Sequence, residues 1–178
     1  MNHDPKDTLL GWLNDAYSME RGIIPVLENH VKDADKMPEV QNHLRMHLEQ
    51  TQRQADQVKM LVESLGGSTS AIKTTMGTVG GFFQSLSTGA APDELVKNAL
   101  ADYATEHFEI ACYRALITGA QALGLNEVAR VCQQILREEE EMARWLEQSL
   151  PMLVQGYLGQ GVTVGAGFQS TPSGTTRF

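Results

Sequence analysis

The stretch ADYATEHFEIACYR, from Ala101 to Arg114, decides the fold. Apolar side chains recur through it and its flanks at a spacing of about 3.5 residues, which predicts the buried face of an amphipathic helix. The positions on this face are Val96, Ala99, Tyr103, Glu106, Ile110, Tyr113, Ile117 and Ala120. Glu106 therefore falls in line with the core. Because an unpaired buried carboxylate is very costly, we expect it to meet a metal, a cation, strong donors or a proton.

The length and charge of the chain limit the classes of function. Its 178 residues, 42% of them hydrophobic, suit one soluble globular domain with a core of its own. The net charge of -8 and the lack of a basic cluster argue against a nucleic-acid partner. No apolar run approaches the ~18 residues that span a bilayer, and no signal-peptide pattern is present. We therefore expect a cytoplasmic protein with no membrane partner.

The two cysteines, Cys112 and Cys132, fall in separate expected helices. They form no Cys-x-x-Cys pair, which argues against both a disulfide framework and a thiolate metal site. We predict that both are unreactive buried thiols.

The first two helices are expected to form a pair joined by a short polar turn. The first starts near Asp7 or Thr8 and places Glu20 in a core position. Pro25 lies inside its pattern and either ends the helix or kinks it; the apolar stripe resumes beyond the proline, which favours a kink. The second helix starts at Pro38 and ends before a pair of glycines. Its inward face carries three polar residues, His47, Thr51 and Gln54.

A long connection precedes the second pair of helices. Residues 68–91 are rich in Gly, Ser and Thr, and their number suits a crossover along the whole bundle, with a short fifth helix as an option. The third helix is expected at 92–124 and the fourth from Asn126 until Pro151 stops it. A further core-phased carboxylate appears in the fourth helix, where the phase does not separate Glu139 from Glu138.

We expect residues 1–150 to form the bundle and residues 151–178 to form a tail. The tail is rich in Gly, Ser and Thr with scattered apolar side chains. Such a composition is typical of a flexible end, and the alternative is that its apolar residues dock onto the bundle or a partner.

The two halves of the chain repeat each other. Tyr17-x-x-Glu20 in the first helix matches Tyr103-x-x-Glu106 in the third. In ferritin-like bundles one helix of each pair gives a Glu and the other a Glu-x-x-His, all aimed at two iron or manganese ions. The predicted fold is therefore all-α, a ferritin-like antiparallel four-helix bundle with a long crossover between helices two and three.

This chain has only part of the ligand set that ferritin-like bundles use for two metal ions. Glu20, Glu106 and Glu139 satisfy it, but Thr51 stands where a bridging glutamate is expected. Both histidines are replaced as well, one by Gln54 and the other by Met142, and a thioether or neutral amide is a weak ligand for iron or manganese. A standard site for two ions therefore cannot be assumed.

The bundle, from Lys6 to Leu150, resembles the YciE/YciF ferritin-like family of bacterial stress-associated proteins. The resemblance rests on the acidic segment before Pro25, on His47-Leu-Glu-Gln-Thr51-x-x-Gln54, on Glu106-His107-Phe108-Glu109-Ile110-Ala111-x-Tyr113 and on Leu136-x-Glu138-Glu139. It implies a homodimeric helical bundle, with metal binding suggested by the fold.

Two alternatives remain for the buried carboxylates. In one, they ligate one or two iron or manganese ions through Glu20, Glu106 and Glu139, with Glu109 as a fourth candidate ligand or a rim ion pair. In the other, hydrogen bonds hold them, from Tyr17, Tyr103, Thr51, Gln54 and His47. His107 projects about 100° from Glu106 around the helix and is expected to lie outside the ligands.

Three functions follow from these alternatives, with no catalytic residue assigned. The leading hypothesis is a metal-binding, stress-associated ferritin-like protein. The second is an oxidase- or peroxidase-type enzyme with two metal ions, against which the missing Glu-x-x-His motifs weigh. The third is a metal-free structural or partner-binding dimer whose tail contacts a partner.

Overall fold

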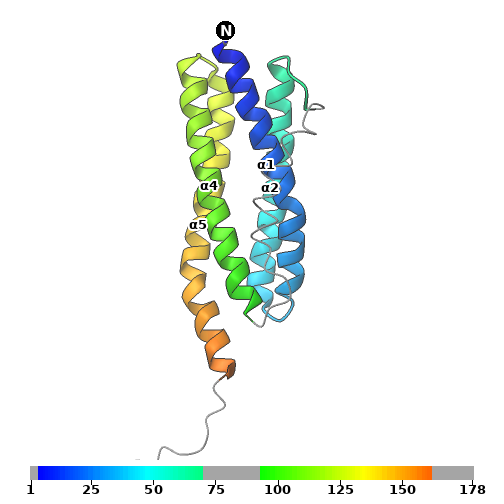
Figure 1. Ribbon diagram of the computed structural model, residues 1–178, viewed down its shortest axis with the longest axis vertical. Coiled ribbons are helices and arrows are strands. Elements are labelled where there is room, and N and C mark those ends of the chain that lie inside the picture. Colours follow the sequence, from blue (N-terminus) through cyan, green and yellow to red (C-terminus); the bar gives the residue numbers. More distant parts are fainter. Residues whose placement is uncertain (1–3, 70–92, 162–178) are drawn as a thin grey trace, which may run out of the picture.

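The computed structural model describes residues 4–69 and 93–161, and these form a bundle of four helices (Figure 1). The helices are α1 (Pro5–Asp33), α2 (Pro38–Ser64), α4 (Glu94–Ala122) and α5 (Asn126–Gly161). Within these ranges no strand occurs. The predicted all-α bundle is confirmed, whereas the optional fifth helix falls mainly on residues outside the described ranges.

The helices pack as two antiparallel hairpins, α1 with α2 and α4 with α5. The chain leaves α2 at one end of the bundle and enters α4 at the opposite end (Figure 1). These positions of the end of α2 and the start of α4 are those that the crossover prediction requires.

Local sequence signals set the helix boundaries. Asp4 caps α1 by accepting the Lys6 backbone N–H at 2.9 Å, so the helix starts at Pro5, slightly before the expected position. Gly66 follows α2 with a φ of 83° and Gly124 follows α4 with a φ of 67°. This left-handed conformation favours glycine and ends both helices.

Two prolines lie inside helices, and the predictions made for them had different outcomes. α1 continues through Pro25 to Asp33, which confirms that the helix does not end there; the kink stays a prediction. The expected stop at Pro151 is wrong, because α5 continues through it to Gly161. Pro151 is exposed, and Leu153 beyond it is buried in the core, so packing offsets the lost backbone hydrogen bond. The remainder of the predicted tail, 162–178, lies outside the described residues.

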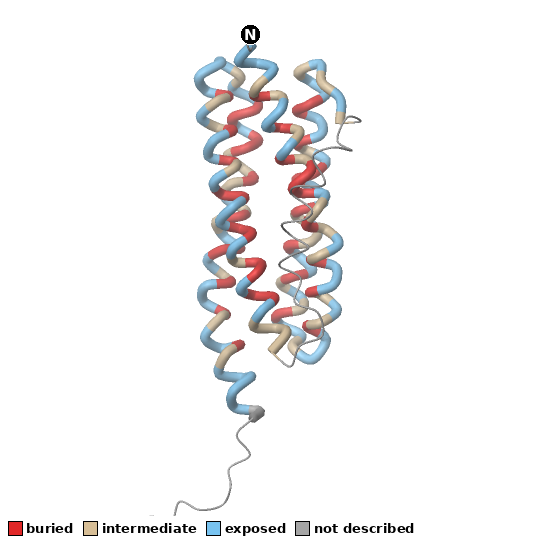
Figure 2. The backbone as a smooth tube through the Cα atoms, in the orientation of Figure 1, coloured by how far each residue is buried: buried red, intermediate tan, exposed pale blue. Residues whose placement is uncertain are grey.

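Buried residues lie on the inner faces of the helices (Figure 2). The apolar ones form a core with two parts. The larger contains Leu13, Val58, Leu116 and Ile135, and the smaller contains residues such as Leu146. On α2, α4 and α5, buried polar side chains separate the two parts: His47, Thr51, Gln54, Asp102, Thr105, Glu106, Glu109 and Glu139. None of the helices in the described ranges is both long and apolar enough to cross a membrane.

Candidate metal centre

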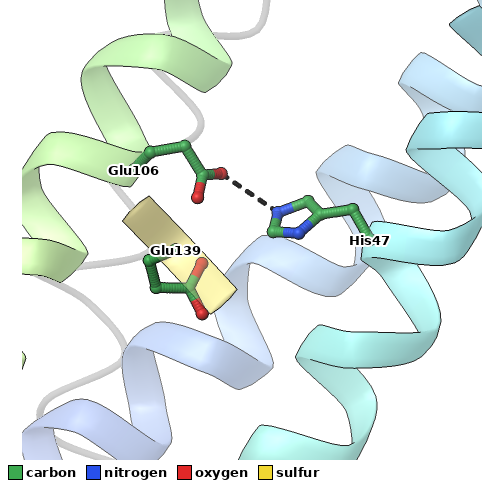
Figure 3. A group of neighbouring side chains, drawn as sticks. All are labelled: His47, Glu106 and Glu139. Atoms are coloured by element: carbon green, nitrogen blue, oxygen red, sulfur yellow. Dashed lines mark ion pairs between the residues drawn. The ribbon is translucent and has the colours of Figure 1, made fainter. Parts of the chain in front are cut away.

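Three buried side chains from three helices meet in the polar layer of the core (Figure 3). His47 comes from α2, Glu106 from α4 and Glu139 from α5. One nitrogen or oxygen atom of each lies within 4.8 Å of the others. The side chains are almost inaccessible, with exposed fractions of 2%, 1% and 0%. We call these residues the triad.

His47 faces the carboxylates with both ring nitrogens available. Its Nε2 lies 3.0 Å from Glu106 Oε1 (Figure 3), an ion-pair distance, but the angles are not those of a hydrogen bond. Neither ring nitrogen has a hydrogen-bond partner among the described residues. Thr51 does not hydrogen-bond to the imidazole, because its hydroxyl donates to the His47 backbone carbonyl at 3.1 Å. An imidazole nitrogen without a hydrogen bond can offer its lone pair to a metal ion.

The carboxylates around His47 also carry unsatisfied oxygens. Within the described ranges, no hydrogen-bond partner exists for either oxygen of Glu139, for Glu106 Oε2, for Glu20 Oε2 or for Glu109 Oε1. Buried polar atoms are normally paired, and several unpaired oxygens in one place require an explanation such as an ion. Imidazole with carboxylates is a donor set that suits iron and manganese. The residues present therefore fit a bound metal ion.

The pKa values of the buried carboxylates also fit a bound metal ion. Burial raises the pKa of Glu106 to about 8, with the charges of Asp102 and Glu20 adding to the rise and the contact with Glu139 opposing it. Burial and mutual repulsion raise the pKa values of Glu20, Glu109 and Glu139 well above their ordinary range. The raised pKa values favour the protonated form of these groups in the absence of a cation, and a dication can replace the protons.

Glu20 has a hydrogen-bond partner that the sequence analysis did not assign. The expected donors Tyr17 and Tyr103 are only half-buried, and the hydroxyl of fully buried Tyr113 donates to Glu20 Oε1 instead. Tyr113 lies on the predicted core stripe, two turns beyond Glu106. That spacing predicts that Tyr113 is buried, but it does not specify which side chain the hydroxyl contacts.

The ambiguity in α5 is resolved in favour of Glu139. Glu139 is fully buried, whereas Glu138 is half-buried and accepts the amide Nε2 of Gln54 at 2.9 Å. Gln54 therefore holds Glu138 and not one of the inward carboxylates. Met142, expected to pack, lies in the smaller part of the apolar core.

Three other histidines lie in the described residues; one behaves as predicted and two have partners that were not predicted. His107 is exposed and contacts the ring of Tyr103 edge-on, outside the triad, as predicted. His30, for which no partner was predicted, is buried with its Nδ1 2.8 Å from Asp102 Oδ1. His43 stacks on Trp145 with a centroid distance of 3.9 Å. For the pair of His30 and Asp102, the available sequence signal was the position of Asp102, one turn before Glu106 on the same face of the helix.

The fold and its buried carboxylates define a ferritin-like four-helix bundle. The family model described as "Domain of unknown function (DUF892)" matches residues 4–159, and the chain belongs to this family.

Solved structures of relatives agree with this assignment. A protein from Xanthomonas campestris is 31% identical over 89% of this chain and 99% of its own, with a TM-score of 0.75. The Escherichia coli stress protein YciF is 23% identical over 87% of this chain and 99% of its own, with a TM-score of 0.69. The resemblance to the YciE/YciF family is thus confirmed.

A bacterioferritin has the same fold. The protein from Desulfovibrio desulfuricans, which has a diiron site, is 21% identical over 97% of both chains, with a TM-score of 0.70. This similarity confirms the ferritin-like fold of the chain.

Proposed function

We propose that this protein binds a divalent metal ion, iron or manganese, through His47, Glu106 and Glu139. The observation that carries the proposal is the triad itself, in which three potential ligand atoms lie within 4.8 Å of one another in a buried layer. The unpaired oxygens and nitrogens of the same residues support it. The ferritin-like fold adds support, because a bacterioferritin with this fold has a diiron site.

The triad differs from the ligand set that the sequence predicted. His47 was expected to hold a carboxylate by a hydrogen bond, and we now propose it as a ligand because both its nitrogens lack such a bond among the described residues. Glu20 and Glu109 are buried in the same polar layer, and each interacts electrostatically with Glu139 or Glu106 of the triad.

The chain's own residues prepare the site for an ion. The two apolar parts of the core exclude water from above and below the triad, which strengthens electrostatic attraction to a cation. Burial raises the pKa values of Glu106 and Glu139, which favours protonated carboxyl groups over two repelling charges in a metal-free core. A bound iron or manganese ion would supply Lewis-acid and redox chemistry.

Metal analysis of single-residue variants tests the proposal. The protein, purified without an affinity tag, is loaded anaerobically with Fe(II) or Mn(II), desalted and analysed for metal content. We expect near-stoichiometric metal in the parent protein and loss of it in Glu139→Gln. The matched control is Glu141→Gln, which changes an exposed glutamate two positions along α5 and should retain the ion. Absence of metal from the parent, or its full retention in Glu139→Gln, would refute the proposal.

Two further parts of the proposal rest on the YciE/YciF resemblance. We propose a stress-associated role and a homodimeric state in the cytoplasm. Light scattering coupled to size-exclusion chromatography should give twice the mass of one chain, and a monomeric mass at all concentrations would exclude the dimer.

A further inference from the structure

Polar side chains on α4 continue from the triad toward one end of the bundle. They recur every four residues, so they lie on one face of the helix with about 6 Å between them along its axis: Glu94, Asn98, Asp102 and Glu106. Asn98 and Asp102 are 4% and 5% exposed, and Glu94, at the start of the helix, is half-buried. The row therefore leads from the partly exposed start of α4 to a residue of the triad.

α1 meets this row with polar side chains of its own. The Asn98 amide Nδ2 donates to Asp33 Oδ2 at 3.0 Å, and Asp102 Oδ1 lies 2.8 Å from His30 Nδ1. α1 ends and α4 begins at the same end of the bundle (Figure 1). We call Glu94, Asn98 and Asp102 of α4, together with His30 and Asp33 of α1, the polar ladder.

Toward the other end of the bundle, α4 and α1 pack through apolar side chains. Leu116 and Ala120 of α4 belong there to the larger apolar part of the core, together with Leu9 and Leu13 of α1. An unpaired charge is very costly in such surroundings, so a cation would not pass on that side. At the inner end of the ladder, by contrast, Glu106 has a buried Oε2 without a hydrogen-bond partner among the described residues.

We propose that the polar ladder is the route by which a divalent cation reaches and leaves the triad. This inference rests on the proposed function, because it concerns how the same ion enters. An ion that sheds its water needs oxygen atoms along its path, and the ladder supplies them from Glu94 at the outer end to Asp102, one helical turn before Glu106. Negative charge along such a path also raises the rate of entry.

The rates of Mn(II) uptake and release test the inference. Uptake is followed with a fluorescent indicator of free Mn(II), and release by mixing the loaded protein with an excess of that indicator. Asp102→Asn keeps a polar side chain of the same size opposite His30. We expect it to slow uptake and release alike, by about tenfold, because a group on the route that does not hold the bound ion affects both directions. The equilibrium affinity should change less than either rate.

The direction of the change distinguishes a route from a purely structural role. If Asp102 only held α1 against α4, weakening its contact with His30 would loosen the core and accelerate both uptake and release. The polar ladder instead predicts slower exchange of the ion.

Glu94→Gln gives a second variant, which leaves the buried part of the ladder unchanged. It removes the half-buried carboxylate at the outer end and should slow uptake by a smaller factor, with the amount of bound metal unchanged. The matched control is Glu63→Gln, which removes an exposed glutamate in the last turn of α2. α2 ends opposite the start of α4 (Figure 1), so this variant should behave as the parent.

The outcomes separate the inference from the proposed function. Unchanged or faster uptake in both Asp102→Asn and Glu94→Gln would overturn the inference, while the parent would still hold its ion. Loss of the bound ion from Asp102→Asn at equilibrium would overturn it too, because Asp102 would then be a ligand. Equal slowing in Glu63→Gln would assign the effect to the overall charge of the protein and also overturn it. A parent protein that takes up no Mn(II) would overturn both the inference and the proposed function.

Discussion

The imidazole Nδ1 of His30 lies 2.8 Å from Asp102 Oδ1, and this buried pair joins α1 to α4. It is the immediate neighbour of the triad along α4, because Asp102 precedes Glu106 by one helical turn. The charge of Asp102 contributes to the raised pKa of Glu106 after the larger effect of burial. The pair therefore affects both the packing of the two hairpins and the charge of the site.

Removing one partner of this pair should destabilise the fold strongly. We expect Asp102→Ala to lower the free energy of unfolding by about 3–5 kcal/mol, because it leaves a buried imidazole without its acceptor. Urea denaturation followed by circular dichroism measures the change. Asp93→Ala, at the position just before α4, removes the acceptor of a surface pair with Lys97 and should have a much smaller effect. Equal losses in the two variants would contradict the structural role of the buried pair.

The stability of the metal-free protein should decrease as the pH rises. The pKa of Glu106 is raised from 4.5 to about 8 by burial, so between these values the folded state binds more protons than the unfolded state. The free energy of unfolding then falls with pH, by up to about 1.4 kcal/mol per pH unit for each such group, and levels off above pH 8. Glu20, Glu109 and Glu139 act in the same direction.

Urea midpoints measured from pH 5 to pH 9 test this dependence. The fall should be smaller in Glu106→Gln, which cannot ionise, and smaller in protein saturated with Mn(II), because the ion replaces the protons. A midpoint that rises from pH 5 to pH 8 in the metal-free parent would contradict the protonated core.

The cysteines should react slowly with thiol reagents in the native protein. Cys132 is fully buried, and burial raises its pKa to about 12; Cys112 is half-buried, and burial likewise raises its pKa. Because the thiolate is the reactive form, a disulfide reagent at pH 8 should label neither rapidly, and both within seconds in denaturant. Cys112→Ser isolates Cys132, which should show the slower rate. Fast native labelling of that variant would contradict its burial.

The turn glycines should be sensitive to substitution. Gly124 has a φ of 67°, so Gly124→Ala should cost about 1–2 kcal/mol although a Cβ would meet no atom within 4 Å. Gly11 lies exposed inside α1 with equally open space around it. Gly11→Ala should therefore stabilise the protein by about 0.5–1 kcal/mol. The midpoint of thermal unfolding is measured for both variants and the parent. Equal shifts of the midpoint in the two variants would indicate that backbone conformation does not determine the effect of alanine on stability.

Helix periodicity was sufficient to predict the four helices and the inward direction of Glu20, Glu106 and Glu109. These properties depend on spacing along one helix, and the sequence contains that spacing directly. It did not separate Glu138 from Glu139, because adjacent positions differ by only about 100° and both border the stripe.

Partners across the bundle could not be predicted in the same way. Tyr113 with Glu20 and His30 with Asp102 come from different helices, and their contact depends on how far one hairpin is shifted along the other. The continuation of α5 past Pro151 also depends on tertiary packing, here the burial of Leu153. From local sequence alone, Pro151 predicts the end of the helix, because the local pattern does not show that Leu153 is buried.

Four polar contacts in and around the triad connect one hairpin to the other. The contacts are His30 with Asp102, Glu20 with Tyr113, His47 with Glu106, and Gln54 with Glu138. A shift of one hairpin by a single helical turn, about 5.4 Å, would separate all four pairs, whereas aliphatic side chains could repack at many offsets. The polar layer therefore specifies the register of the two hairpins, and it does so before any ligand arrives.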